Sequence, residues 1–331
     1  MDPLKNIDHL IAAGQFPLQI GEGLKKFFES YKEALESNDK EFSDFYPLLN
    51  TFTDLVMDQL QTPFAFEPYH QRITSPFDYY RFGLELMRPL ILFDRSKVIN
   101  LENVEKIAQQ VKNKENVILF ANHQTEPDPQ IINLLLESKF PDLVKEIIFV
   151  AGHRVISDPL AIPFSRGCNL LCIFSKKYLE SPPEEKTQKQ LHNQKTLQRM
   201  KSLLEEGGKC IYVAPSGGRD RMNSEGVVEV APFDFQSIEL FYLISQQVKP
   251  ATHFYPLALS TYHLLPPPAS IAKTLGERRY AQCTPVSLSF GNEIEMRDFP
   301  GNIPTDKRKN RELRTDHIFK LVKDDYQRLI D

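Results

Sequence analysis

The chain has 331 residues, 41% of them hydrophobic and 25% charged, which is enough to bury one large core together with a smaller satellite. Its formal net charge of -4 argues against a nucleic-acid-binding protein. Because no run of about 18 apolar residues occurs, we expect no transmembrane segment.

The start of the chain and its cysteines bear on the compartment. The segment Met1-Asp2-Pro3-Leu4 has neither the apolar region of a secretory signal nor the Arg- and Ser-rich character of a transit peptide. Four cysteines without a disulfide-like pattern fit a reducing compartment. We therefore expect a cytoplasmic bacterial protein. A mature plastid form without its leader, located in the stroma, would show the same features.

Two patterns follow each other along the chain. Up to about residue 75, apolar and polar residues alternate at helical spacing, which predicts a small N-terminal helical bundle domain over residues 1–75. From 76 to 331, strand-like runs alternate with helical stretches, which predicts the α/β class: a mixed, mostly parallel sheet layered with helices. The strand-like runs are 117–121, 146–151, 170–174, 210–214, 254–260 and 286–290, and the helical stretches include 131–139, 187–206 and 306–330.

A histidine and an aspartate lie five residues apart after the first strand-like run. His123 and Asp128 would sit at a strand-to-helix turn, since Pro129 suits the first position of a helix whose apolar residues begin at Ile131. Ligands bind outside the carboxyl ends of strands in open α/β sheets. The pair is therefore a candidate general base with its orienting acid. The structural alternative makes Asp128 a helix N-cap and His123 an ordinary hydrogen-bonded histidine.

Cations follow two further strand-like runs. Lys176 and Lys177 come after the run 170–174, and Arg219 and Arg221 come after the run 210–214. The turn Ser216-Gly217-Gly218 can bend sharply, and alternate residues of an extended chain point the same way, so two guanidinium groups would face one anion. The sequence therefore predicts a phosphate site.

Two considerations refine this phosphate site. A small phosphorylated substrate fits better than a nucleotide, because neither Gly-x-x-x-x-Gly-Lys-Ser/Thr nor Gly-x-Gly-x-x-Gly occurs. The structural alternative pairs the two arginines with Asp220, Glu225 or Glu229 on a solvated loop.

The cysteines predict no metal site. Cys168 and Cys172 have the wrong spacing for a zinc knuckle and lie on or beside a strand, so buried thiols are the better interpretation. We therefore predict neither a metal nor a resident cofactor.

Roughly residues 65 to 295 carry a set of longer motifs. They are Glu67-Pro68-Tyr69-His70, Pro76-Phe77-Asp78-Tyr79-Tyr80, Arg88-Pro89-Leu90-Ile91, Asn122-His123-Gln124-Thr125-Glu126 with Asp128-Pro129, Asp158-Pro159-Leu160, Ala214-Pro215-Ser216-Gly217-Gly218-Arg219-Asp220-Arg221, Pro232-Phe233-Asp234, Phe254-Tyr255-Pro256-Leu257-Ala258-Leu259 and Pro266-Pro267-Pro268. In these motifs the chain resembles the soluble, plastid-type glycerol-3-phosphate 1-O-acyltransferases, a family that also has bacterial relatives.

The resemblance implies a transferase that moves an acyl chain from an acyl carrier protein or coenzyme A thioester to the C1 hydroxyl of glycerol 3-phosphate, the first step of phospholipid synthesis. His123 and Asp128 match the family's His-x-x-x-x-Asp motif, and residues 76–331 would form the catalytic domain. An alcohol is a poor nucleophile, so His123 would take its proton as general base while Asp128 orients the ring. The sequence identifies no oxyanion donors.

The resemblance also implies which residues hold the substrate phosphate. The matching positions are Lys177, Tyr178, Arg219 and Arg221. Tyr178 departs from the family, which has a histidine there, and a phenol carries no charge at neutral pH. His153 stands where the family has an acidic residue.

The expected partners are glycerol 3-phosphate and the acyl thioester, with only a transient membrane-surface contact at product release. A basic cluster would attract an acidic acyl carrier protein, although such a run is more often a solvated face. The cluster consists of Lys307, Arg308, Lys309, Arg311 and Arg314 together with Arg278 and Arg279.

Three other functions stay open from the residues alone. The first is an acyltransferase for another alcohol, such as 1-acyl-glycerol 3-phosphate, against which the lack of a membrane anchor counts. The second is a non-catalytic acyl-carrier or lipid-binding protein, which a lost base or lost cations would favour. The third is a serine hydrolase using Ser216, although no Gly-x-Ser-x-Gly elbow surrounds that residue.

Overall fold

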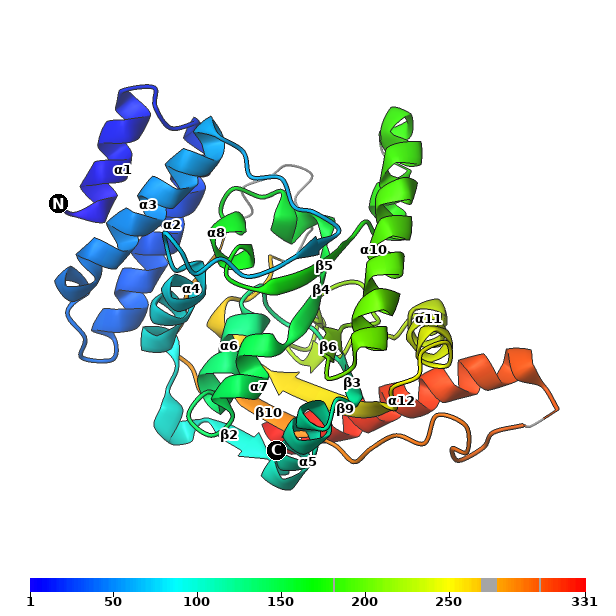
Figure 1. Cartoon of the computed structure of the whole chain (residues 1–331). Coiled ribbons are helices and arrows are strands. Elements are labelled where there is room, and N and C mark those ends of the chain that lie inside the picture. Colours follow the sequence, from blue (N-terminus) through cyan, green and yellow to red (C-terminus); the bar gives the residue numbers. More distant parts are fainter. Residues whose placement is uncertain (181, 269–278, 304) are drawn as a thin grey trace.

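A large sheet forms the centre of the fold. The computed structural model describes residues 1–180, 182–268, 279–303 and 305–331, with side chains for all of these except Lys176 and Lys177. The strands of the sheet are β1 (Tyr69–His70), β2 (Lys97–Ile99), β3 (Asn116–Ala121), β4 (Ile148–Gly152), β5 (Asn169–Ile173), β6 (Cys210–Val213), β9 (Thr252–Ser260) and β10 (Ser287–Phe290). They lie in the order β1-β5-β4-β6-β3-β9-β10-β2 (Figure 1). A separate hairpin pairs β7 (Arg221–Met222) with β8 (Val228–Glu229).

Most of the sheet is parallel. The five central strands β5, β4, β6, β3 and β9 run in one direction, whereas β1 and β10 pair antiparallel with β5 and β9. This confirms the predicted α/β class with a mixed, mostly parallel sheet. All six predicted strands form, each within two residues of its predicted ends. The strands β1 and β2 were not predicted, because two or three residues are too short to show a period.

Helices surround the sheet. The α-helices are α1 (Pro3–Ala12), α2 (Leu18–Glu36), α3 (Tyr46–Gln61), α4 (Tyr79–Met87), α5 (Leu101–Lys112), α6 (Asp128–Leu136), α7 (Pro141–Glu146), α8 (Ile162–Ser165), α9 (Lys176–Leu179), α10 (Lys186–Glu206), α11 (Phe235–Ser245) and α12 (Lys307–Ile330). Short 3-10 helices are η1 (Phe42–Phe45), η2 (Arg88–Leu90), η3 (Phe93–Arg95), η4 (His153–Ile156), η5 (Pro183–Glu185) and η6 (Tyr262–Leu264). Within the described ranges, no helix is both long and apolar enough to cross a membrane.

The helices cover both faces of the sheet, as the strand β3 illustrates. Its side chains point alternately to opposite faces, and all of them are buried. Ile118 and Phe120 belong to a core shared with α10, α11 and α12, whereas Val117 and Leu119 belong to a core shared with α5, α6 and α7. A strand covered on both sides needs a continuous apolar run, which explains why residues 117–121 show no alternation of polar and apolar residues.

The N-terminal helices α1, α2 and α3 form the predicted bundle, seen in blue in Figure 1. Their apolar core also includes Leu264 and Leu265, which belong to the α/β part. In α2, the Ser30 hydroxyl accepts a hydrogen bond from the backbone N–H of Ala281 at 2.9 Å. The bundle therefore packs directly on the rest of the chain. The domain boundary at residue 75 stays a prediction.

The parallel strands bring four loops to one edge of the sheet. Since β3, β4, β5 and β6 are parallel, their carboxyl ends lie on the same side. The residues that follow these ends include His123, His153, Tyr178 and Arg219. The topology thus places potentially reactive and charged residues that lie far apart in the sequence at one edge of the sheet.

Candidate active site

The loop after β3 joins His123 to Asp128. The Nδ1 atom of His123 lies 2.8 Å from Oδ2 of Asp128, whose side chain is 1% exposed, whereas that of His123 is 27% exposed. A buried carboxylate bonded to Nδ1 fixes the ring so that a proton sits on Nδ1 and a lone pair on Nε2. The arrangement suits a general base whose Nε2 reacts.

The interpretation of Asp128 as the N-cap of the following helix is wrong. Asp128 is itself the first residue of α6, and Pro127 holds the N-cap position. The Asp128 Oδ2 atom accepts hydrogen bonds from the preceding backbone N–H groups of Gln124, at 2.9 Å, and Thr125, at 3.3 Å. Its Oδ1 atom accepts from the Thr261 hydroxyl at 2.6 Å. The carboxylate therefore organises the loop that carries His123.

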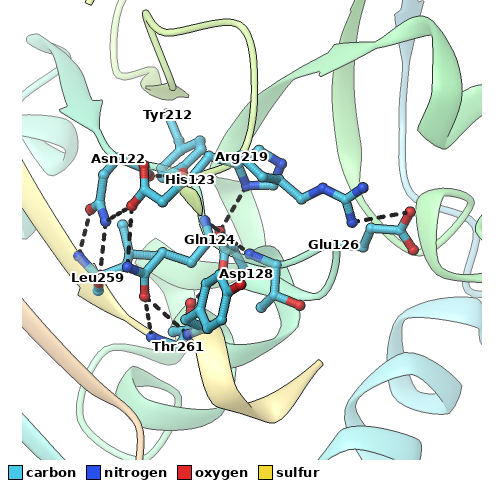
Figure 2. A network of polar contacts seen from close by, with 12 residues as sticks. Asn122, His123, Gln124, Glu126, Asp128, Tyr212, Arg219, Leu259 and Thr261 are labelled. Atoms are coloured by element: carbon cyan, nitrogen blue, oxygen red, sulfur yellow. Dashed lines mark hydrogen bonds and ion pairs between the residues drawn. The ribbon is translucent and has the colours of Figure 1, made fainter. Parts of the chain in front are cut away.

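Two amide side chains fasten this loop to the neighbouring strand (Figure 2). Asn122 exchanges hydrogen bonds with the backbone of Leu259, at 2.7 Å and 3.0 Å. The carbonyl oxygen of the Gln124 side chain accepts from the backbone N–H groups of Thr261, at 2.7 Å, and Tyr262, at 3.0 Å. All of these contacts join residues more than 130 positions apart, and sequence analysis missed them.

Asp220 completes the support from the turn after β6. Its side chain is fully buried, and its Oδ2 atom accepts from Asn122 at 2.8 Å and from Gln124 at 3.1 Å. The Asp220 backbone N–H donates to the His123 carbonyl oxygen at 2.7 Å. Gly217, at φ 64°, supplies the left-handed backbone that the turn needs. Asp220 thus holds the two loops together, and the alternative in which it pairs with the arginines is wrong.

Arg219 lies beside a carboxylate of the histidine loop. Its Nη1 atom is 3.9 Å from Oε1 of Glu126, and both side chains are largely buried (Figure 2). The pKa of Glu126 is raised by burial, but the positive charges of Arg279 and Arg219 outweigh burial and hold it below its usual value. Glu126 is therefore ionised at neutral pH. The structure thus brings Arg219 close to the loop that carries the candidate base.

The remaining candidates for the phosphate site lie around the same edge. Arg221 begins β7 and donates to the Pro268 carbonyl oxygen at 3.2 Å. Lys177 lies in α9, but its side chain is outside the described part of the structure. Tyr178 also lies in α9, with its ring 5.5 Å from that of His153. Burial, assisted by the charge of Lys189, lowers the pKa of His153.

Comparison with known proteins identifies the family. A family model described as Acyltransferase matches residues 95–260, from η3 to the end of β9. The chloroplastic glycerol-3-phosphate acyltransferase of Arabidopsis thaliana is 35% identical over 329 residues, which cover 98% of this chain and 72% of that protein. The chain belongs to the glycerol-3-phosphate acyltransferase family. It is therefore an enzyme of the acyltransferase class.

Other relatives agree with this assignment. The chloroplastic glycerol-3-phosphate acyltransferase of Pisum sativum is 37% identical over 300 residues, covering 89% of this chain and 65% of the relative. The chloroplastic glycerol-3-phosphate acyltransferase ATS11 of Cucurbita moschata is 39% identical over 287 residues, covering 86% of this chain and 64% of the relative. The chain thus spans about two thirds of the length of these relatives.

Two minor predictions for this acyltransferase can be assessed from the structure. Cys168 and Cys172 are buried free thiols, as predicted, and burial raises the pKa of each to about 12. The Ser216 hydroxyl donates to the Gly218 carbonyl oxygen within its own turn, at 2.8 Å, which gives no support to a serine hydrolase.

The basic cluster of the acyltransferase is only partly a surface feature. Arg314 is 8% exposed, donates to Glu239 at 2.7 Å and lies over the ring of Tyr242. Arg279 has a 12% exposed side chain and pairs with Glu126. Both are therefore wrongly assigned to a docking surface, because they are held inside the fold by carboxylates. Arg278 lies outside the described residues.

Asp220 is expected to make the stability of the acyltransferase depend on pH. Burial raises its pKa to about 6, although hydrogen bonds from Ala231, Asn122 and Gln124 act in the opposite direction. Because the folded-state pKa lies above the unfolded one, the contribution of this group is complete below about pH 4 and is lost as the pH rises through about 6. The Tm of the native protein minus the Tm of Asp220→Asn should therefore fall as the pH rises through this window.

This difference is measured by thermal unfolding of both proteins between pH 4 and 8. Asp316→Asn, an exposed change in α12, is the matched control and should show no such trend. A Tm difference that stays constant, or that grows with pH, would contradict the assignment of the raised pKa to Asp220.

Proposed function

We propose that this acyltransferase moves an acyl chain from an acyl carrier protein or coenzyme A thioester to the C1 hydroxyl of glycerol 3-phosphate. The observation that carries the proposal is the buried Asp128 carboxylate 2.8 Å from Nδ1 of His123, on a loop that also places Glu126 beside Arg219. A base and a guanidinium group at one sheet edge suit an acceptor that combines a hydroxyl with a phosphate.

His123 acts as the general base in the proposed mechanism. Its Nε2 takes the C1 hydroxyl proton as that oxygen forms a bond to the thioester carbonyl carbon. Asp128 stabilises the resulting imidazolium through Nδ1. The tetrahedral intermediate then expels the thiolate, which receives the proton from His123. The products are 1-acyl-glycerol 3-phosphate and the free thiol.

The acceptor is held by its phosphate. A phosphate monoester carries about -1.5 to -2 charges at neutral pH, and guanidinium donors match its oxygens geometrically. We assign this role to Arg219 and Arg221, with Lys177 and Tyr178 in α9, after the carboxyl end of β5, which β4 separates from β6. Arg219 directly precedes Asp220, whose backbone N–H donates to the His123 carbonyl oxygen. A phosphate bound to Arg219 would therefore hold the acceptor hydroxyl near the base.

The names of the relatives support a proposal for the compartment, and the chemistry of acyl transfer supports one for the acyl donor. Because these relatives are chloroplastic, we propose the plastid stroma, with the bacterial cytoplasm as the alternative. Acyl carrier protein and coenzyme A thioesters are both proposed as donors. No further cofactor is required by the proposed mechanism.

The test is thiol release from a long-chain acyl thioester, measured with and without glycerol 3-phosphate, with the lipid product identified. Release that depends on the acceptor and yields 1-acyl-glycerol 3-phosphate is expected. Release without the acceptor would indicate a hydrolase. If 1-acyl-glycerol 3-phosphate replaced glycerol 3-phosphate as the better acceptor, the enzyme would catalyse the other acylation.

Arg219→Ala is expected to raise the KM for glycerol 3-phosphate by about 10- to 100-fold, because a charge-assisted hydrogen bond contributes about 1.5–3 kcal/mol. The KM for the acyl thioester should change little. Steady-state kinetics with each substrate varied separately measures both values. Arg95→Ala removes an exposed arginine of η3 and is the matched control. An unchanged KM for glycerol 3-phosphate would remove Arg219 from the phosphate site.

A further inference from the structure

Arg279 binds the carboxylate that lies beside Arg219. Its Nε atom donates to Oε2 of Glu126 at 2.7 Å, and its Nη2 atom donates to Oε1 at 3.2 Å. This is the two-bond geometry in which a guanidinium matches a carboxylate best. The two residues are 153 positions apart, and their side chains are 12% and 20% exposed. The pair is therefore a specific, largely buried contact.

Two arginines share this single carboxylate unequally. Arg279 makes two hydrogen bonds to Glu126, whereas Nη1 of Arg219 stays 3.9 Å from Oε1, beyond hydrogen-bond distance for these two atoms. A carboxylate in a two-bond pair with Arg219 would occupy the donors that a phosphate needs. Glu126 is therefore hydrogen-bonded to Arg279 in preference to Arg219.

A second carboxylate holds Arg279 in place. Asp158, in the segment after η4, accepts from Nη2 of Arg279 at 3.3 Å. The Asp158 side chain is 3% exposed, and its other oxygen accepts from the backbone N–H of Leu160 at 2.9 Å. Arg279 therefore ties the loop after β3 to the loop after β4.

The charges of this group also bear on anion binding. Arg219 and Arg279 carry two positive charges, and Glu126 and Asp158 carry two negative charges when ionised. Removal of the Arg279 charge would leave the group with an excess of one negative charge beside Arg219. In a partly buried site, where charges are weakly screened, such an excess repels a phosphate dianion.

We propose that Arg279 is a positioning residue for the acceptor site: by binding Glu126 with two donors, it prevents Glu126 from competing with the substrate phosphate for Arg219. The inference rests on the proposed function of Arg219 as a phosphate ligand. Arg279 itself acts through Glu126.

The test compares Arg279→Gln with the double variant Glu126→Gln/Arg279→Gln. We expect the single change to raise the KM for glycerol 3-phosphate by about tenfold, the effect of losing one charge-assisted contact. The values of kcat and of the KM for the acyl thioester should stay within about twofold, since neither involves this charge. The double variant has no carboxylate to compete for Arg219, so its KM should return to within about threefold of the native value. Arg95→Gln is the matched control.

A merely structural role predicts other results. If Arg279 only supports the fold, the single variant would change kcat and both KM values together, or the double variant would remain as impaired as the single one; either result overturns the inference. If Arg279→Gln does not fold, judged by its Tm, Arg279→Lys tests the same point. Lysine keeps the charge without the two-donor geometry, so an intermediate rise in the KM for glycerol 3-phosphate is expected, and an unchanged value overturns the inference.

The Arg219→Ala result separates this inference from the proposed function. A raised KM in Arg219→Ala with a native KM in Arg279→Gln overturns the role of Arg279 and leaves the phosphate site standing. A native KM in Arg219→Ala contradicts the phosphate site itself, and the inference then fails with it. Competitive inhibition by inorganic phosphate, measured on the same variants, should follow the KM for glycerol 3-phosphate.

Discussion

Replacing His123 by alanine is expected to lower kcat for acyl transfer by about 10²–10⁴-fold, the contribution of a positioned general base. The change removes the Nε2 atom that would take the hydroxyl proton, but it leaves Arg219 and Glu126 in place. The KM for glycerol 3-phosphate should therefore change little. The measurement is acceptor-dependent thiol release at saturating concentrations of both substrates.

The matched control for this prediction is His9→Ala, which removes an exposed histidine in α1. Its kcat should equal that of the native enzyme. A folded His123→Ala variant that keeps more than about a tenth of the native kcat would show that another group is the base.

Asp128→Asn is expected to lower kcat by about 10³–10⁴-fold, because the amide removes the charge that stabilises the imidazolium and fixes the ring. The replaced carboxylate accepts bonds from His123 and from the Thr261 hydroxyl, and it is buried. An amide can keep only part of this set, so a lower Tm should accompany the lower kcat. Single-turnover kinetics and thermal unfolding measure the two effects separately.

Two comparisons make this result specific. Asp316→Asn, in an exposed part of α12, should change neither kcat nor Tm by a measurable amount. Asp128→Asn combined with His123→Ala should be hardly slower than His123→Ala alone, because both residues act as one unit. Losses in kcat that simply multiply would contradict the assigned pair.

The sequence predicted the elements that have a strong local pattern. The run 117–121 is apolar because β3 is covered on both faces, and the stretch 187–206 contains no glycine or proline that would interrupt a helix. The spacing of His123 and Asp128 also revealed the site, since a strand, a turn and a helix N-terminus lie together in the chain. The elements and residues that could be predicted are therefore those whose pattern lies within one short stretch of the sequence.

Contacts between distant residues account for what could not be predicted. Asp220 looked like a partner for its neighbouring arginines, but its bonds go to Asn122 and Gln124, 98 and 96 positions away. Arg279 looked like part of a basic surface, whereas Asp158 and Glu126 draw it into the site. The N-cap interpretation of Asp128 failed for a more local reason, because Oδ2 accepts from the preceding N–H groups of Gln124 and Thr125 and contacts His123, and only Oδ1 bonds to a distant residue, Thr261. Such pairings depend on the strand order, which one sequence does not specify.

The hydrogen bond between Ser30 and the Ala281 backbone has a consequence for recombining relatives of this enzyme. It fixes the backbone two residues after Arg279, so α2 helps to set the position of the Arg279 guanidinium beside the acceptor site. A chimera that joins this α/β part to the N-terminal helices of another relative would keep the base and its aspartate. Its affinity for the acceptor would depend on the foreign helices. The N-terminal helices and the α/β part should therefore be exchanged as one unit.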